Sequence, residues 1–126
     1  MRRRSKRPAF LDLTKIRMPV GALTSILHRA TGVILAASVP AAVYLFGLSI
    51  RDEQGFVRVT ELFAQRAFKT LAVIVVWALA HHLLAGVRHM LTDLGVGSSL
   101  RVARGSGWLV NLAGVVLALL AARTMW

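Results

Sequence analysis

Three long stretches without Asp, Glu, Lys or Arg constrain this chain more than any other feature of its sequence. They cover residues 30–50, 70–87 and 105–122. A bilayer core about 30 Å thick needs roughly 20 helical residues. A membrane helix can also extend past its last charge, because long basic side chains reach back to the interface. Each stretch is therefore long enough to cross a membrane as a helix.

The composition supports a membrane protein rather than a soluble domain. The chain is 56% hydrophobic, yet it carries 16 Lys and Arg against 5 Asp and Glu. High apolarity with an excess of basic charge is typical of a small integral membrane protein with basic ends. The basic residues lie between the apolar stretches, which argues against a nucleic-acid-binding protein. The absence of cysteine excludes disulfides and cysteine-ligated clusters in this chain.

We therefore predict an all-α integral membrane fold with two parts. Residues 1–19 form a basic segment that is cytoplasmic at its start and interfacial between Pro8 and Pro19. Residues 20–126 form a transmembrane domain of three helices, the first of which Pro40 should kink. The first apolar stretch is too long, and starts too far from Met1, for a signal peptide.

The distribution of Lys and Arg predicts the orientation of these helices. The N-terminal segment 1–19 holds seven basic residues against a single acidic residue, Asp12. Cytoplasmic segments carry such an excess, so the N-terminus should be cytoplasmic. The loop 51–69 mixes both charges and should face outward. The loop with Arg101 and Arg104 then faces the cytoplasm, and the C-terminus lies outside. Trp108 and Trp126 bracket the third stretch as an aromatic belt would.

The helix predicted from the second stretch carries histidines at a spacing that indicates a ligand site. His82, Gly86 and His89 lie at i, i+4 and i+7, so they share one helix face. His81 is rotated away from that face by about 100°. Gly86 removes a side chain between the two histidines and should leave a shallow bay for a flat ligand. A haem would fit, with its iron at His82 and its propionates toward His89.

The first helix carries a matching polar stripe formed by Ser25, His28, Arg29 and Gly32. With the predicted topology, both stripes lie in the same leaflet and can form one site. A single membrane histidine is usually a hydrogen-bonded structural residue, and a terminal arginine usually reaches to the interface. Two converging stripes favour function instead, because ionisable groups inside a membrane are costly.

Two motifs in this chain resemble those of a known family. The first contains Ser25, His28, Arg29, Thr31 and Gly32, and the second contains His82, Gly86, Arg88, His89 and Asp93. Together with "RPAFLDLTKIRMP" they resemble the cytochrome b556 subunits of succinate dehydrogenase, the larger of two small membrane anchors of succinate:quinone oxidoreductase. The resemblance covers the whole chain, and both motifs occur in order and at full spacing.

The resemblance implies a haem b in this part of the chain. His82 would be an axial ligand of the haem iron, and His28, Arg29 and His89 would lie near the haem propionates. Neutral imidazole is a good ligand of haem iron. A bis-histidine haem needs a second histidine, which the resemblance assigns to a second anchor subunit that also completes the helical bundle.

The resemblance also implies a ubiquinone site and a set of partners. Ser25 and Arg29 would line the pocket for ubiquinone, with Ile26 packed against it. The partners would be the second anchor subunit, an iron–sulfur subunit and a flavoprotein subunit, all at a bacterial inner membrane. The chain would thus be a subunit of an oxidoreductase complex, without a complete active site of its own. The alternatives are a fumarate reductase anchor, a haem-free structural anchor and a proton-conducting membrane subunit.

Overall fold

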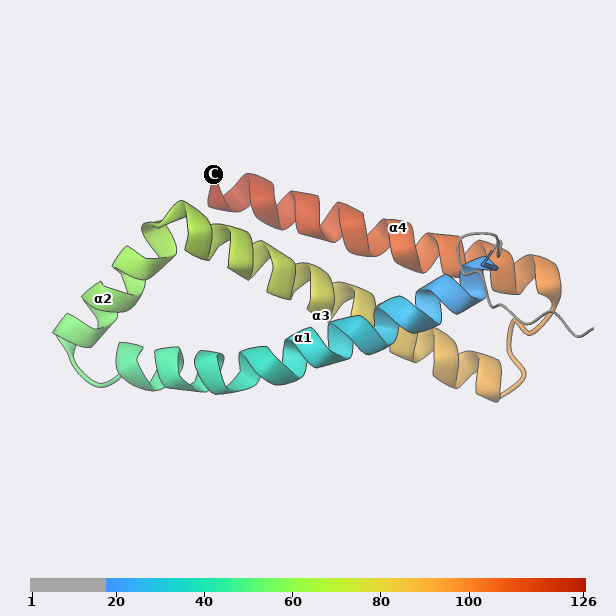
Figure 1. Ribbon diagram of the computed structural model, residues 1–126, viewed down its shortest axis with the longest axis horizontal. Coiled ribbons are helices and arrows are strands. Elements are labelled where there is room, and N and C mark those ends of the chain that lie inside the picture. Colours follow the sequence, from blue (N-terminus) through green and yellow to red (C-terminus); the bar gives the residue numbers. More distant parts are fainter. Residues whose placement is uncertain (1–17) are drawn as a thin grey trace, which may run out of the picture.

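All regular structure in residues 18–126, the part that the computed structural model describes, is helical. The helices are α1 (Val20–Ser49), α2 (Glu53–Ala64), α3 (Arg66–Asp93) and α4 (Leu100–Met125) (Figure 1). Three of them, α1, α3 and α4, are long and apolar enough to cross a membrane. This confirms the predicted all-α fold with three transmembrane helices. The basic residues 1–17 lie outside the described part.

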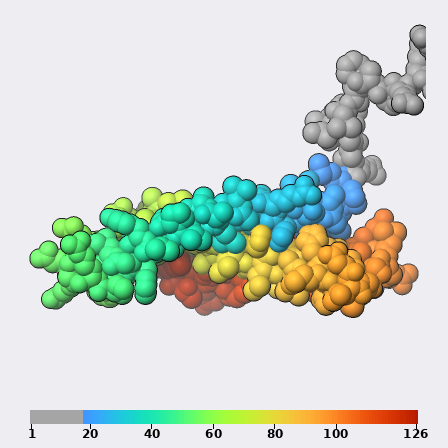
Figure 2. Space-filling model, turned by 90° about the horizontal axis from the view of Figure 1, so that it is seen from below, coloured from blue at the N-terminus to red at the C-terminus, as the bar shows by residue number. Residues whose placement is uncertain are grey.

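The three long helices pack along one another in an elongated bundle (Figures 1 and 2). The start of α1, the end of α3 and the start of α4 lie at one end, whereas α2 and the C-terminus lie at the other. α1 continues through Pro40 to Ser49. Large apolar side chains cover the outside, and Val33 and Leu109 are both about 70% exposed. Such a surface suits lipid or another membrane helix.

Small residues allow the long helices to approach closely. A Cβ atom on Gly107 of α4 would lie 3.2 Å from Cγ1 of Val20 on α1. A Cβ atom on Gly114 would lie 3.2 Å from Cβ of His81 on α3. Glycine at a helix contact lets the backbones come near, and van der Waals packing is the main attraction between helices in lipid. These two glycines therefore place α4 against both α1 and α3.

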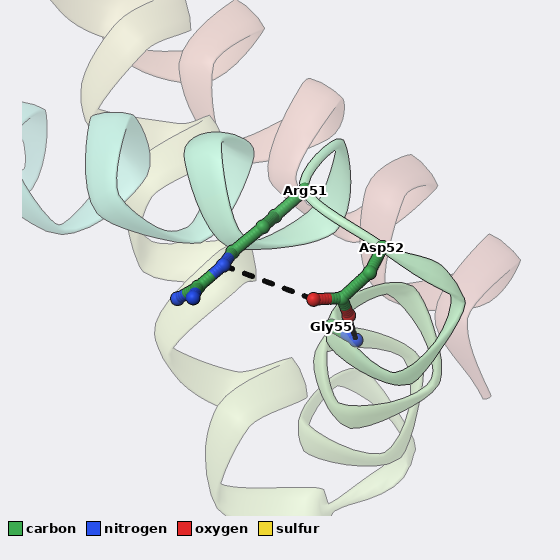
Figure 3. A network of polar contacts seen from close by, with 3 residues as sticks. All are labelled: Arg51, Asp52 and Gly55. Atoms are coloured by element: carbon green, nitrogen blue, oxygen red, sulfur yellow. Dashed lines mark hydrogen bonds and ion pairs between the residues drawn. The ribbon is translucent and has the colours of Figure 1, made fainter.

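The short helix α2 lies in the segment that the charge pattern assigns to a loop. Its first turn is capped by Asp52, whose carboxylate accepts a 2.6 Å hydrogen bond from the Gly55 N–H (Figure 3). A Cβ atom on Gly55 would collide with the carbonyl oxygen of Leu48, so only glycine fits at this turn. The ion pair of Arg51 with Asp52, at 3.8 Å, is exposed and contributes little.

A glycine turn reverses the chain between α3 and α4. Gly95 has a φ of 79°, which a residue with a Cβ adopts only at a cost. The Val96 N–H donates to the Leu91 carbonyl and the Gly95 N–H donates to the Thr92 carbonyl, both at 2.9 Å. These two bonds form a Schellman motif, which satisfies the last carbonyls of α3. The turn brings α4 back along α3 as its antiparallel neighbour.

Candidate functional site

The histidines expected at the site come together between α1 and α3. The imidazole rings of His28 and His82 stack with centroids 4.0 Å apart and planes 13° from parallel. The ring of His89 meets His28 edge-on, with centroids 5.3 Å apart. The spacing of His82 and His89 along α3 therefore brings both residues to α1, and the two polar stripes converge as the sequence predicts.

The His82 ring is held in one orientation by α1. Its Nδ1 lies 3.0 Å from the carbonyl oxygen of His28 and 3.3 Å from the Thr31 hydroxyl. A carbonyl oxygen can only accept a hydrogen bond, so Nδ1 carries the proton. In the imidazole tautomer with a proton on Nδ1 the lone pair is on Nε2, and no hydrogen bond among residues 18–126 uses that atom. This is the state in which histidine binds a metal through Nε2, with the other nitrogen fixing the ring.

Two glycines make room for the stacked rings, one on each helix. A Cβ atom on Gly32 of α1 would lie 3.0 Å from Cε1 of His82. A Cβ atom on Gly86 of α3 would lie 3.4 Å from Nε2 of His28. Each glycine thus accommodates the histidine of the opposite helix. The His28 imidazole therefore lies beside Gly86, where the sequence predicts a shallow bay.

The three residues expected at a quinone pocket lie on the first half of α1 and are only partly covered. Ser25 is half-buried, Ile26 is 47% exposed and Arg29 is exposed. Within the described part of the chain, the side chains of Ser25 and Arg29 make no hydrogen bond. They are near one another on α1 but are not enclosed. Any pocket that they line needs further walls, which this chain does not supply over residues 18–126.

Arg88, which belongs to the second motif, is bound to α4 and not to the histidines. Its Nε donates to the Ser106 hydroxyl at 3.0 Å, and one terminal nitrogen donates to the Ala103 carbonyl at 2.9 Å. A guanidinium group inside a membrane is costly unless its N–H groups find acceptors. The contact to Ser106 explains why a hydroxyl interrupts the apolar stretch of α4.

His81 lies on another face of α3 from its neighbour His82 and is almost completely buried, at 1% exposed. Its Nε2 lies 3.0 Å from Oδ1 of Asn111 on α4. The single proton of the Thr24 hydroxyl of α1 has two acceptors within reach, the Val20 carbonyl at 2.9 Å and the same Asn111 oxygen at 3.3 Å. This contact was not predicted from the sequence, although Asn111 in the middle of an apolar stretch is a visible signal.

The described residues 18–126 contain no group of three or more His, Cys, Asp or Glu side chains that could hold a metal ion. The chemistry available between α1 and α3 is that of individual imidazoles. His82 offers one oriented nitrogen, and His28 and His89 lie beside it. Such an arrangement can supply a single ligand to a metal whose other ligands come from elsewhere.

Comparisons with known proteins agree with one another. The family described as succinate dehydrogenase/fumarate reductase transmembrane subunit matches residues 3–121. The succinate dehydrogenase cytochrome b556 subunit of Coxiella burnetii is 34% identical over 123 residues, which cover 97% of this chain and 98% of that protein. The proteins of the same name from Rickettsia typhi and Paracoccus denitrificans are 33% and 31% identical. They cover 92% and 93% of this chain, and 90% of each relative is matched.

Proposed function

The chain belongs to the succinate dehydrogenase/fumarate reductase transmembrane subunit family. On that premise, we propose that it holds a haem b and helps to form the site where ubiquinone is reduced with electrons from succinate. It is a membrane subunit of an oxidoreductase complex, and the dehydrogenase chemistry belongs to other subunits. The names of the relatives include cytochrome b556, which implies a b-type haem in those proteins.

The observation that carries the haem proposal is the orientation of His82. The porphyrin supplies four nitrogen ligands to the iron, so the protein needs to supply only axial ones. His82 presents the free lone pair of Nε2, while the His28 carbonyl fixes Nδ1–H. A hydrogen bond from the distal ring nitrogen to a carbonyl is the usual support of a metal-binding histidine. When bound, the haem would accept and release single electrons.

The second axial ligand is proposed to come from another membrane subunit. Two histidines that bind one haem iron must point their lone pairs at each other from opposite sides. The rings of His28 and His82 instead lie face to face, with their planes 13° apart. A ring lone pair lies in the plane of the ring, so these two rings do not point at a common iron. His28, Arg29 and His89 are better suited to charged groups at the edge of the haem, such as the propionates.

The partly exposed Ser25, Ile26 and Arg29 are proposed to form part of the ubiquinone site. The Ser25 hydroxyl can donate a hydrogen bond to a quinone carbonyl oxygen. The positive charge of Arg29 can stabilise negative charge that develops on that oxygen during reduction. Ile26 offers an apolar surface to the quinone ring. The missing walls would come from the second anchor subunit and the iron–sulfur subunit, with the flavoprotein subunit beyond.

We also propose the cellular setting from the charge pattern. The start of α1 would lie at the cytoplasmic face of a bacterial inner membrane, where the soluble subunits bind, and the C-terminus would lie outside. The relatives' names favour succinate oxidation over fumarate reduction, although the family contains both. A haem-free structural anchor and a proton-conducting subunit remain as rivals. The structural anchor has no use for the free Nε2 of His82, whereas a proton-conducting subunit could use it as a proton acceptor, so the spectrum must separate the two haem-free rivals from the haem proposal.

A difference spectrum of the purified complex tests the haem proposal. The dithionite-reduced minus oxidised spectrum should show a sharp b-type α band, with one haem for each copy of this chain. A complex that contains all subunits but shows no such band would overturn the proposal. In that case the haem-free rivals would remain.

A further inference from the structure

One amide group joins all three long helices near the candidate site. Oδ1 of Asn111 on α4 lies 3.0 Å from Nε2 of His81 on α3 and 3.3 Å from the Thr24 hydroxyl on α1. We call Thr24, His81 and Asn111 the polar junction. Its members on α1 and α3 directly precede Ser25 and His82 in the sequence. Thr24 and His81 are almost completely buried, and Asn111 is half-buried.

We propose that Asn111 is a positioning residue that fixes the rotation of α3, so that His82 faces α1 with its Nε2 free for the haem iron. The proposal rests on the proposed haem function. Asn111 itself touches neither His82 nor the quinone residues by any hydrogen bond in the described part of the chain. Its effect would be transmitted through His81, which is the neighbour of His82 on the same helix.

The helical geometry of α3 explains how holding one histidine aims the other. Successive residues on a helix are rotated by about 100°. His81 and Arg88 are seven residues apart and both bond to α4, through Asn111 and Ser106. His82 and His89 are also seven residues apart and both face His28 on α1. The contacts of His81 and Arg88 with α4 therefore set the rotation of α3 about its axis, and with it the direction in which His82 and His89 face α1.

The packing around His81 makes this contact stiff. A Cβ atom on Gly114 would lie 3.2 Å from Cβ and 3.5 Å from Cα of His81, so α4 touches α3 at the base of this side chain. The imidazole then reaches along α4 to Asn111. A close backbone approach combined with a hydrogen bond leaves α3 little freedom to turn about its axis. A purely apolar contact at the same place would resist turning less.

The polar junction is also poorly explained by stability alone. Nδ1 of His81 and Nδ2 of Asn111 are buried and have no hydrogen-bond partner among residues 18–126. A partly satisfied polar network inside an apolar environment is less favourable than well-packed apolar side chains. Polar pairs of this kind can instead specify one arrangement among several. A role in fixing the rotation of α3 would explain why His81 and Asn111 are present, although apolar side chains at these positions would stabilise the fold as well.

The decisive experiment compares two variants in the complete purified complex. The single variant Asn111→Leu leaves His81 buried without a partner and should lower the melting temperature. The double variant His81→Leu with Asn111→Leu removes both polar groups and should recover most of that loss. The readouts are the low-spin haem signal in electron paramagnetic resonance and the haem reduction potential. Both depend on how the axial ligands are oriented. Thr124→Leu, on the same helix, is the control, since its hydroxyl donates to the Ala121 carbonyl within α4.

We expect the double variant to bind haem with a shifted resonance signal and a shifted potential, while its melting temperature is near that of the unaltered complex. Thr124→Leu should change neither readout. A double variant with both the original signal and the original potential would overturn the positioning role. An unaltered complex with no low-spin haem signal would overturn the proposed function, and the positioning role with it. The spectrum of the unaltered complex therefore distinguishes failure of the haem proposal from failure of the positioning role.

Discussion

Gly32 of α1 lies so close to the His82 ring of α3 that a Cβ atom on this glycine would be 3.0 Å from Cε1 of the imidazole. At the second glycine contact, a Cβ atom on Gly86 would lie 3.4 Å from Nε2 of His28, which is an ordinary van der Waals distance. The two glycines therefore differ in how much they tolerate a methyl group. The tighter contact involves the histidine whose orientation supports haem binding.

Gly32→Ala should reduce the haem content of the purified complex, whereas Gly86→Ala should reduce it much less. The alanine at position 32 must push the His82 ring away from α1, which disturbs its bond to the His28 carbonyl. Both substitutions raise helix propensity equally, so Gly86→Ala serves as the matched control. Haem is measured by the pyridine haemochrome assay against protein. Equal haem content in both variants would contradict the importance of the close contact.

His82→Ala should remove the low-spin haem signal, whereas His81→Ala should retain haem. The reason is that His82 has a free Nε2 beside α1, while Nε2 of His81 is bonded to Asn111 on α4. The measurement is the reduced-minus-oxidised spectrum of membranes with equal amounts of assembled complex. Loss of haem only in His81→Ala would show that the ligand assignment is wrong. A shifted but present signal in His81→Ala agrees with its role beside the ligand.

Ser25→Ala and Arg29→Leu should sharply lower succinate:ubiquinone activity. Losing a hydrogen bond that involves a charged group costs about 1.5–3 kcal/mol. If that bond forms mainly in the transition state, the rate falls roughly 10- to 150-fold. Succinate oxidation with an artificial acceptor that takes electrons upstream should persist on the same membranes. Equal loss of both activities would indicate failed assembly, and normal quinone activity in both variants would exclude the proposed site.

Haem content must be measured alongside the Arg29→Leu activities, because this arginine is also proposed to lie near the propionates. Val33→Leu provides a control on the same helix, since Val33 is 71% exposed and belongs to neither motif. It should leave both activities unchanged.

Gly55→Ala should lower the melting temperature of the complex, because the added methyl group collides with the Leu48 carbonyl at the turn between α1 and α2. Overpacking of this kind typically costs about 1–3 kcal/mol. Asp52→Ala removes the cap of α2 and should cost about 1 kcal/mol. Gly47→Ala is the control, as a Cβ atom there meets nothing within 4 Å. A Gly55→Ala complex as stable as the Gly47→Ala complex would contradict the described turn.

Reporter fusions test the orientation. Alkaline phosphatase fused after Trp126 should be active, because we predict an outward C-terminus, and a fusion at Ser98 should be inactive. A fluorescent protein that folds only in the cytoplasm should give the opposite pattern. The reverse result would place the start of α1, with Ser25 and Arg29, at the outer face, away from soluble subunits on the cytoplasmic side.

Helix positions and the meeting of the histidines were predictable because both depend on simple periodicities. The apolar stretches mark α1, α3 and α4, and the seven-residue spacing of His82 and His89 places them on one face. The short helix α2 was not predicted, since charge counting treats the segment 51–69 as a loop. Its signal was local: Asp52 at a helix N-terminus, followed by Gly55 where no side chain fits.

The contacts between helices were harder to predict than the helix face on which each residue lies. That His81 points away from His82 follows from helical rotation, but its partner Asn111 follows only from the way α3 and α4 pack. The bay predicted at Gly86 shows the same limit. A missing side chain indicates that something approaches closely, but sequence alone does not say that the occupant is the His28 ring. The proposed covering of Ser25 and Arg29 would come from other chains, which this sequence does not contain.

The two polar side chains of α3 that bond to α4, His81 and Arg88, also bear on how the chain enters the bilayer during synthesis. Alone, α3 would expose Arg88 and the buried His81 to acyl chains, where each is costly. Antiparallel to α4, the same groups face Ser106, the Ala103 carbonyl and Asn111. The hairpin of α3 and α4 is thus better matched to lipid than either helix alone. Partitioning from the translocation channel should favour release of the two helices together, with the glycine turn at Gly95 setting their alignment.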